Sequence, residues 1–235
     1  MIFAVAACAV LTVPTSVGAQ SETRDLPKII EPRDIVSVIG PALLYTLPEI
    51  TGIHSDSVLC VPCDRSSVPF FDRWVIAPTR PAASTASDIV HAGLAAVTWL
   101  DLADEGALGH AGIVTSIESF LWAEGAVHLV KALVGRKRPV LYTNSGIAVA
   151  HVGSNQRSWP SGHAATAAAL ATSYCLTRRE LSANRTVDWR CWLAAAGAVA
   201  VGALRMGAAK HYPSDVLGGW AAGVGTAFAV HAIKF

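Results

Sequence analysis

The feature that most constrains the fold is a series of long apolar stretches with few helix-breaking residues. They cover residues 87–103, 110–134, 163–180, 190–208 and 215–233. A further stretch from Asp34 to about Leu47 carries apolar residues at helical spacing and is interrupted by Pro41. No strand-like alternation lasts more than a few residues, and no internal repeat is visible. The sequence therefore predicts an all-α fold, a helical bundle of about five to six main helices.

The composition excludes several classes of protein. Apolar residues make up 52% of the 235-residue chain and charged residues 15%, against roughly 45–50% and about 25% in ordinary soluble proteins. A disordered chain lacks this much apolar surface. The net charge of +1 provides no basic stripe, so nucleic acid is not an expected partner. The length allows one large domain or at most two small ones, and the oligomeric state is left open.

The N-terminal residues have the features of a secretory signal peptide. Residues 2–13 are uncharged and apolar, and small residues precede the bond between Ala19 and Gln20. We therefore expect residues 1–19 to direct export and the mature chain to lie on the periplasmic side. A short N-terminal anchor helix is the alternative. A lipoprotein signal ending at Cys8 is disfavoured, because so few residues precede the cysteine that an ordinary hydrophobic region has no room.

Residues 20–87 are expected to form an N-terminal helix and a proline-rich loop or lid, and residues 88–235 the main bundle. The loop covers residues 55–87, where prolines and small polar residues are frequent. Three aromatic side chains are expected to anchor it: Phe70, Phe71 and Trp74. Expected helix starts carry polar caps at Ser87-Asp88, Ser161 and Ser214-Asp215.

The cysteines divide into a close pair and two separate residues. Cys60 and Cys63 are spaced as C-x-x-C, which is weak support for zinc because no second pair and no suitably spaced histidine accompany them. In an oxidising compartment, a local Cys60–Cys63 disulfide is the favoured interpretation. Cys175 and Cys191 lie in separate helical stretches and are expected to be buried apolar residues.

Membrane association is expected, but the sequence leaves open whether the bundle spans a bilayer. Residues 191–204 and 216–230 are uncharged and rich in small residues, as membrane helices can be. By contrast, the stretch 110–134 contains Glu118 and Lys131, and each charge at mid-span costs at least ~2.5 kcal/mol on insertion scales.

Three short stretches concentrate the polar residues that a helical core does not need. They are 131–139 (KALVGRKRP), 159–163 (WPSGH) and 205–215 (RMGAAKHYPSD). In the first, Lys131 ends a helix and Pro139 biases Arg138 to an extended conformation. A plain basic cap that complements the helix dipole is the alternative interpretation of this stretch.

The second and third stretches add an anion site and a pair of histidines. Ser161 and Gly162 precede a helix, whose first amides bind anions, and His163 lies in its first turn. A capped helix with an incidental histidine is the alternative. In the third stretch, Asp215 lies four residues after His211, close enough to accept its Nδ1 proton and leave Nε2 as a nucleophile. A role for Asp215 as helix cap is compatible with this one.

Together the stretches supply what a phosphoryl group requires. Lys131, Arg138 and Arg205 are three cations for its oxygens, Ser161 and Gly162 are neutral donors, and two histidines can serve as nucleophile and acid.

The motifs K-x6-R-P, P-S-G-H and R-x5-H-x3-D occur in the order in which they characterise a known family. In this, residues 88–233 resemble the type 2 phosphatidic-acid phosphatase superfamily, which includes lipid phosphate phosphatases, bacterial class A acid phosphatases and vanadium-dependent haloperoxidases. The resemblance implies that His211 forms a phosphohistidine, that Asp215 orients it, and that His163 protonates the leaving group. It also implies a phosphate site without metal or other cofactor, made of Lys131, Arg138, Ser161, Gly162 and Arg205.

The chain departs from the family pattern at two positions and carries a segment that suggests substrate choice. Leu204 stands where the family usually has Ser, and Ala164 where Thr is common; we expect altered tuning, not loss of activity. The segment between the first two motifs is expected at the mouth of the site. Its polar residues are Tyr142, Asn144, His151, Asn155, Gln156 and Arg157, and ordinary loop polarity is the alternative for each.

The expected function is hydrolysis of phosphomonoesters or pyrophosphates through a phosphohistidine. The apolar helices favour a lipid-linked substrate such as a phosphatidic acid or an isoprenyl diphosphate, and a small soluble ester is the other possibility. The alternative function is a vanadium-dependent haloperoxidase with the same anion pocket. A protein that only binds phosphate or a lipid headgroup is disfavoured, because simple anion binding needs no carboxylate-backed histidine.

Overall fold

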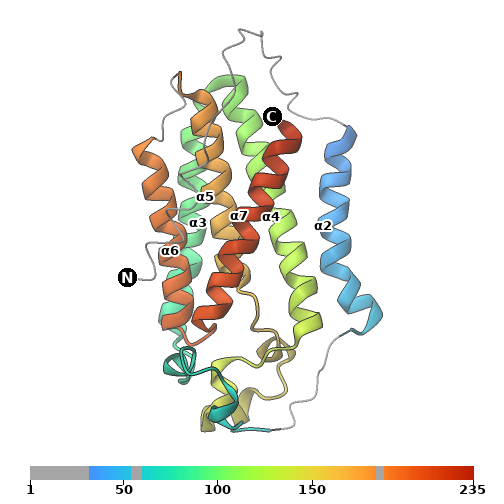
Figure 1. The fold of residues 1–235 in the computed structure, drawn as a ribbon, viewed down its shortest axis with the longest axis vertical. Helices are drawn as coiled ribbons and strands as arrows, with labels where there is room; N and C mark the ends of the chain where they lie inside the picture. Colours follow the sequence, from blue (N-terminus) through green and yellow to red (C-terminus); the bar gives the residue numbers. More distant parts are fainter. Residues whose placement is uncertain (1–31, 54–59, 184–187) are drawn as a thin grey trace.

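A computed structural model of the chain describes residues 32–53, 60–183 and 188–235 (Figure 1). This part is all-helical and contains six α-helices, which confirms the predicted all-α bundle. They are α2 (Pro32–Thr51), α3 (Pro81–Ala103), α4 (Gly106–Val134), α5 (Gly162–Leu181), α6 (Trp189–Gly207) and α7 (Pro213–Lys234). The predicted signal peptide, residues 1–19 with Cys8, lies outside the described residues.

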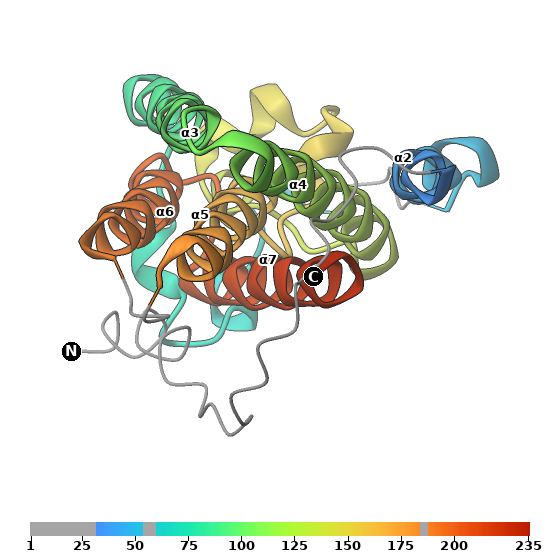
Figure 2. The same ribbon diagram turned by 90° about the horizontal axis from the view of Figure 1, so that it is seen from above.

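Helix α5 forms the centre of the bundle, with α3, α4, α6 and α7 around it (Figure 2). Its alanine-rich sequence explains this position, because small buried side chains let neighbouring helices approach closely. The approach is tightest to α7: a Cβ added at Gly223 would lie 1.9 Å from the carbonyl oxygen of Ala165. Helix α2 packs on the outer side of α4 and continues through Pro41 and Pro48.

Two of the three predicted helix starts differ from the structure. Ser161 caps α5 as expected, since its Oγ accepts from the Ala164 amide at 3.5 Å. Helix α3 begins at Pro81, not at Ser87-Asp88, because proline is well suited to the first helical turn. Residues 81–87 are therefore helical and not part of a loop.

Helix α7 also begins earlier than expected, at Pro213. Tyr212 is its N-cap residue, and Asp215 is the third residue of the helix. Asp215 Oδ2 accepts a hydrogen bond from the Tyr212 amide at 2.9 Å, which places the carboxylate in a capping box.

Small aliphatic residues, not aromatic ones, anchor the N-terminal loop (residues 60–80). Val68, Val75 and Ile76 are buried in a core cluster with residues of α5, α6 and α7. The predicted aromatic anchors are wrong: Phe70 is 81% exposed, and Phe71 and Trp74 are also exposed. The short helices η1 (Arg65–Ser67) and η2 (Arg73–Val75) give the segment a helical period, so positions three or four apart face inward together.

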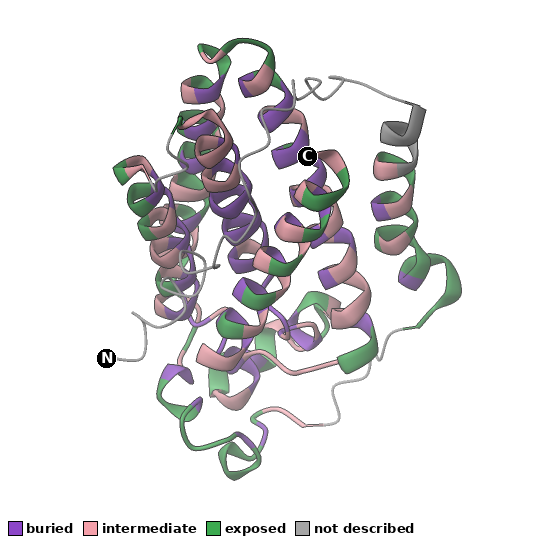
Figure 3. Ribbon diagram, turned by 45° about the horizontal axis from the view of Figure 1, so that its top comes forward, coloured by how far each residue is buried: buried purple, intermediate pink, exposed green. Residues whose placement is uncertain are grey.

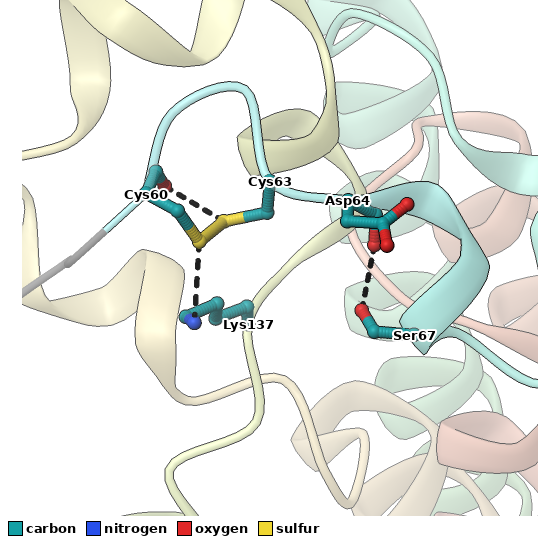
Figure 4. The surroundings of a disulfide bond; sticks show 5 residues. All are labelled: Cys60, Cys63, Asp64, Ser67 and Lys137. Atoms are coloured by element: carbon teal, nitrogen blue, oxygen red, sulfur yellow. Dashed lines mark hydrogen bonds between the residues drawn. A yellow bond between two sulfur atoms is a disulfide. The ribbon is translucent and has the colours of Figure 1, made fainter.

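A disulfide joins Cys60 to Cys63, as predicted (Figure 4). The loop that it closes rests on the chain after α4. The Cys63 amide donates to the carbonyl oxygen of Leu141 at 3.0 Å, and Lys137 Nζ lies 3.5 Å from Cys60 Sγ. Cys175 and Cys191 are free thiols packed in a second core cluster between α3, α5 and α6.

Two segments in the described part of the chain are long and apolar enough to cross a membrane, Gly106–Tyr142 and Pro213–Lys234. Length and composition are the whole of this support, and the core helix of a soluble protein can share both. Large apolar side chains are also exposed on several helices, among them Val38, Leu43 and Ile50 of α2. Figure 3 shows in green where exposed residues lie along the ribbon. The exposed apolar side chains weakly support membrane association.

Candidate active site

The three polar motifs meet at one end of the bundle. The N-terminal loop, the connection from α4 to α5 and the turn from α6 to α7 all lie at the lower end in Figure 1. The connection from α4 to α5 contains three short helices, η3 (Pro139–Tyr142), η4 (Asn144–Val149) and η5 (Gly153–Gln156). The loops together cover the N-terminus of α5 and the C-terminal ends of α4 and α6.

The first motif turns from helix to extended chain within a few residues. Gly135 ends α4 in the left-handed conformation (φ 60°) and donates its amide to the Lys131 carbonyl. Arg138 is extended before Pro139, as predicted, and its amide donates to the Asn155 carbonyl at 2.7 Å. Lys131 and Arg138 are both half-buried at this end of the bundle.

The second motif forms the N-terminus of α5, which lies beside Lys131 of the first motif. A Cβ added at Gly162 would lie 3.0 Å from Lys131 Nζ and 3.3 Å from Glu124 Oε2. The ammonium group of Lys131 therefore sits against the N-terminus of α5, where the positive end of the helix dipole adds to its charge. The Ser161 amide donates to the backbone carbonyl of Asp215 at 2.9 Å, which joins the second motif to the third.

The third motif brings a buried arginine and a buried histidine to the same end. Arg205 is 6% exposed, and its NH1 lies 3.2 Å from Ser87 Oγ and 3.5 Å from Asp88 Oδ1. His211 is 1% exposed in the turn between α6 and α7.

The guanidinium groups of this site retain unused donors. Within the described residues, the Nε atoms of Arg138 and Arg205 are buried without a hydrogen-bond partner. Burial and the charge of Arg205 lower the pKa of Arg138 to about 10, and burial lowers the pKa of Arg205 as well. Burial, reinforced by both arginines, lowers the pKa of Lys131 to about 8, although Glu124 opposes this shift. An anion among these cations would relieve their repulsion and satisfy their free donors.

The tautomer of His211 follows from its neighbours. Its Nδ1 lies 2.8 Å from the Ser158 carbonyl oxygen, whereas Asp215 Oδ2 is farther away at 3.5 Å. Because a carbonyl oxygen can only accept, Nδ1 carries the proton and Nε2 keeps its lone pair. The expected direct bond to Asp215 is thus replaced by one to the backbone, because the cap geometry directs the carboxylate to the Tyr212 amide. Burial, followed by the charges of Arg138 and Lys131, lowers the pKa of His211 to about 3.

His163 lies at the edge of the site and contacts a carboxylate that sequence analysis did not identify as functional. Its Nε2 is 2.9 Å from Asp88 Oδ1, and since a carboxylate can only accept, Nε2 carries a proton. The rings of His163 and His91 are 5.4 Å apart. Burial, then the charges of Arg205 and His91, lower the pKa of His163 to about 4, and Asp88 opposes this shift.

An apolar cavity of about 330 Å³ opens beside His163 between α3, α4 and α5. Asp88, His91 and His163 line its polar end. Its apolar lining includes Trp99, Ile117, Phe120 and Leu170. The cavity therefore offers a mainly apolar group a place next to the histidine expected to act as acid.

The connection from α4 to α5 uses part of its polarity for its own structure. Asn155 is buried and donates from Nδ2 to the Val149 carbonyl at 3.0 Å, and Gln156 is buried as well. Arg157 pairs with Glu49 of α2 at 2.6 Å. Three other candidates for substrate choice are half-buried or exposed: Tyr142, Asn144 and His151.

Several residues of this end were not identified from sequence. They are Asp72, Asp88, His91, Arg136 and Ser158. Arg136 lies inside the first motif and could have been noticed, and Asp88 was interpreted as a helix cap. Asp72 and Ser158 have no local sequence signal, because their contacts are with residues far along the chain.

No group of three or more His, Cys, Asp or Glu side chains that could hold a metal ion occurs in the described segments 32–53, 60–183 and 188–235.

The comparisons with known proteins agree with the motifs. A family model described as the PAP2 superfamily matches residues 112–235, the part of the chain that contains all three motifs. No curated protein and no solved structure matches the chain.

Proposed function

Because the chain belongs to the PAP2 superfamily, which includes phosphatases, we propose that it hydrolyses phosphomonoesters or pyrophosphates through a phosphohistidine intermediate. The observation that carries this proposal is the pair of buried, unpartnered Nε atoms of Arg138 and Arg205 in the described chain. The charge of Arg138 reaches His211 and contributes to lowering its pKa, and the bond from Nδ1 to the Ser158 carbonyl leaves the lone pair on Nε2 of that ring. Guanidinium groups with unused donors bind the oxygens of a phosphoryl group tightly.

The first step transfers the phosphoryl group to the protein. His211 Nε2 attacks phosphorus, the bond from phosphorus to the leaving oxygen breaks, and the doubly protonated ring of His163 gives that oxygen its Nε2 proton and becomes neutral. Lys131, Arg138, Arg205, Ser161 and Gly162 hold the other phosphate oxygens. Asp215 stabilises the positive charge that the His211 ring gains when Nε2 becomes bonded to phosphorus.

The second step restores the protein. His163, now neutral, accepts a proton from water while the water oxygen attacks phosphorus. The N–P bond breaks, its electron pair returns to His211 Nε2, and inorganic phosphate leaves. No metal and no other cofactor takes part in this proposal. Retention of turnover in excess EDTA by the purified protein is the expected result.

The substrate proposed here is lipid-linked, with a phosphatidic acid or an isoprenyl diphosphate as representative classes. The leaving group has to reach His163, and the apolar cavity lies on that side of the ring. The exposed apolar faces of the helices support a protein that meets such substrates at a membrane. Export to the periplasmic side remains a prediction from residues 1–19.

The decisive experiment measures phosphate release by His211→Ala. We expect loss of turnover in a protein that still folds, because the substitution removes the nucleophile, and thermal unfolding measures the stability lost with this buried side chain. His110→Ala is the matched control, since this histidine is exposed at the opposite end of α4. Wild-type phosphate release by folded His211→Ala protein would overturn the assignment of the nucleophile.

The substrate is tested with a panel that combines soluble phosphoesters, phosphatidic acid and an isoprenyl diphosphate. Higher kcat/KM for the lipids supports the role of the apolar cavity. The alternative, a vanadium-dependent haloperoxidase, is tested in parallel by vanadate-dependent oxidation of halide by peroxide. Halide oxidation without phosphoester turnover would favour that alternative.

A further inference from the structure

Arg136 links the candidate active site to the N-terminal loop. Its NH1 donates to Asp215 Oδ1 at 2.5 Å and to Ser214 Oγ at 2.7 Å, and its NH2 donates to Asp72 Oδ2 at 2.7 Å. The guanidinium also lies 4.2 Å from the centre of the Tyr212 ring. A planar group with this many fixed contacts has one orientation, so Arg136 holds two carboxylates at a set separation.

Asp72 is the more unusual member of this set. It lies in the N-terminal loop, before the residues that match the family, and it is fully buried. Besides Arg136, it accepts from the Ser214 amide at 3.1 Å and from Ser214 Oγ at 2.6 Å. A carboxylate buried at such a position is costly unless it is paired, and both partners of the Asp72 carboxylate, Arg136 and Ser214, belong to the site end of the bundle.

The resulting charges alternate toward His211. Asp72 is negative, Arg136 positive and Asp215 negative, and Asp215 Oδ2 lies 3.5 Å from His211 Nδ1. Arg136 alone would neutralise Asp215 and weaken its attraction for a positively charged imidazole. Asp72 offsets the charge of Arg136, so that a net negative charge remains beside His211. Although burial opposes it, the two carboxylates hold the pKa of Arg136 above its ordinary value.

We propose that Asp72 and Arg136 are positioning residues for phosphoryl transfer. Arg136 orients the Asp215 carboxylate, and Asp72 orients Arg136 and preserves the negative charge that stabilises the phosphohistidine. This inference rests on the proposed function, because it concerns the same nucleophile. It assigns to the N-terminal loop a role in catalysis and not only in covering the end of the bundle.

The main test is Asp72→Asn, which keeps the size of the side chain and removes its charge. We expect kcat to fall by about 10- to 100-fold. Losses of this size are common when a side chain that orients a reacting group, without touching the substrate, is replaced. KM should change little, because the cations that hold phosphate are untouched. Asp64→Asn is the matched control, since Asp64 is exposed in the same loop and bonds within its own turn.

Two inhibitors separate positioning from a merely structural role. Vanadate copies the transition state at His211 Nε2, whereas orthophosphate only occupies the anion site. In Asp72→Asn, the inhibition constant for vanadate should rise by the factor by which kcat falls, and that for orthophosphate should stay unchanged. Equal weakening of both inhibitors would indicate a distorted anion site and would overturn the proposal.

A double-mutant cycle tests whether Asp72 acts through Arg136. The double variant Asp72→Asn/Arg136→Gln should be no slower than Arg136→Gln alone, because the path to Asp215 is already broken. If the two effects on kcat multiply, Asp72 acts by another route and the proposal is wrong. Melting temperatures of all variants are measured beside the kinetics.

Arg136→Lys keeps the test decisive if Asp72→Asn does not fold. Lysine keeps the positive charge but cannot contact both carboxylates in a fixed plane, so kcat should fall while the charge balance is unchanged. Wild-type kcat in Arg136→Lys would overturn the proposal. A failure of the proposed function is distinguishable from both results, because the wild-type protein would then release no phosphate at all.

Discussion

Both ends of the bundle carry buried or half-buried arginines. The arginine at one end is paired with carboxylates, whereas those at the other end keep donors without a partner. At the upper end in Figure 1, Arg178 of α5 contacts Asp188 at 2.8 Å and Asp101 at 3.4 Å, and it also pairs with Glu105. At the lower end, Arg138 and Arg205 leave their Nε donors unpartnered within the described chain. The first cluster joins α3 and α5 to the start of α6, and the second retains the donors that the proposed substrate would use.

The electrostatics of the two ends differ accordingly. The carboxylates around Arg178 outweigh its burial and raise the pKa of that guanidinium. Burial and the neighbouring Arg205 lower the pKa of Arg138 to about 10. Arginines paired with several carboxylates are typical of clusters that stabilise a fold, whereas crowded cations with unpartnered donors are typical of an anion site, as proposed for the lower end. Partners, and not the residue type, therefore distinguish structural arginines from functional ones.

The largest effect is expected from substitutions that remove a cation from the lower cluster. Arg138→Gln or Arg205→Gln should lower kcat/KM by about 10²–10³-fold, because a charged donor to the transition state is lost. The melting temperature should stay the same or rise, since repulsion among the cations is reduced. Phosphate release and thermal unfolding measured on the same preparations check both parts. A variant with wild-type kcat/KM would remove that arginine from the phosphate site.

The second prediction concerns an anion that fills the lower cluster. Orthophosphate at about 100 times its dissociation constant should stabilise the native protein by ~2.7 kcal/mol and raise its melting temperature. Arg138→Gln should lose most of this increase, whereas Arg178→Gln should keep it. Scanning calorimetry with and without phosphate provides the measurement. Equal protection of both variants would contradict the difference between the ends.

The third prediction concerns a substitution that removes the shared cation of the upper cluster. Arg178→Gln leaves three carboxylates without their shared cation and should lower the free energy of unfolding by about 1–3 kcal/mol. Because the site is at the other end of α5, kcat/KM should change little. Chemical denaturation and steady-state kinetics distinguish this outcome from that of Arg138→Gln. A large loss of kcat/KM without loss of stability would reverse the assignment of the two clusters.

The smallest expected effect concerns Asp88, the carboxylate next to the lower cluster. In the proposed mechanism, the free protein needs protonated His163, so kcat/KM should fall as pH rises through the pKa of this histidine. Asp88 raises that pKa against the effects of burial and Arg205. Asp88→Asn should therefore move the fall in kcat/KM to lower pH.

The pH profile is measured from pH 3 to 8, with Asp104→Asn as the control, because Asp104 is exposed at the other end of α3. An unchanged profile in Asp88→Asn would show that its carboxylate does not influence His163.

Much of the bundle could be predicted from local sequence. Long apolar stretches located all six described helices, five of them to within four residues at each end, and Ser161 was correctly identified as a cap. The start of α3 was misplaced by six residues or so because Ser87 is a credible cap, while Pro81 is an equally good first residue. The aromatic anchors of the N-terminal loop were wrong because hydrophobicity alone does not say which side of a short helical turn faces inward.

Features that depend on a few neighbouring residues could be read locally: helix periods, caps, the Cys60–Cys63 disulfide and the three motifs. Which groups those motifs face depends on the packing of the whole bundle. Arg136 meets Asp72 across 64 positions and Asp215 across 79, and His211 meets the Ser158 carbonyl across 53. Such pairings depend on how helices pack, and no local pattern encodes them, because contacts between distant residues form only when the whole core is assembled.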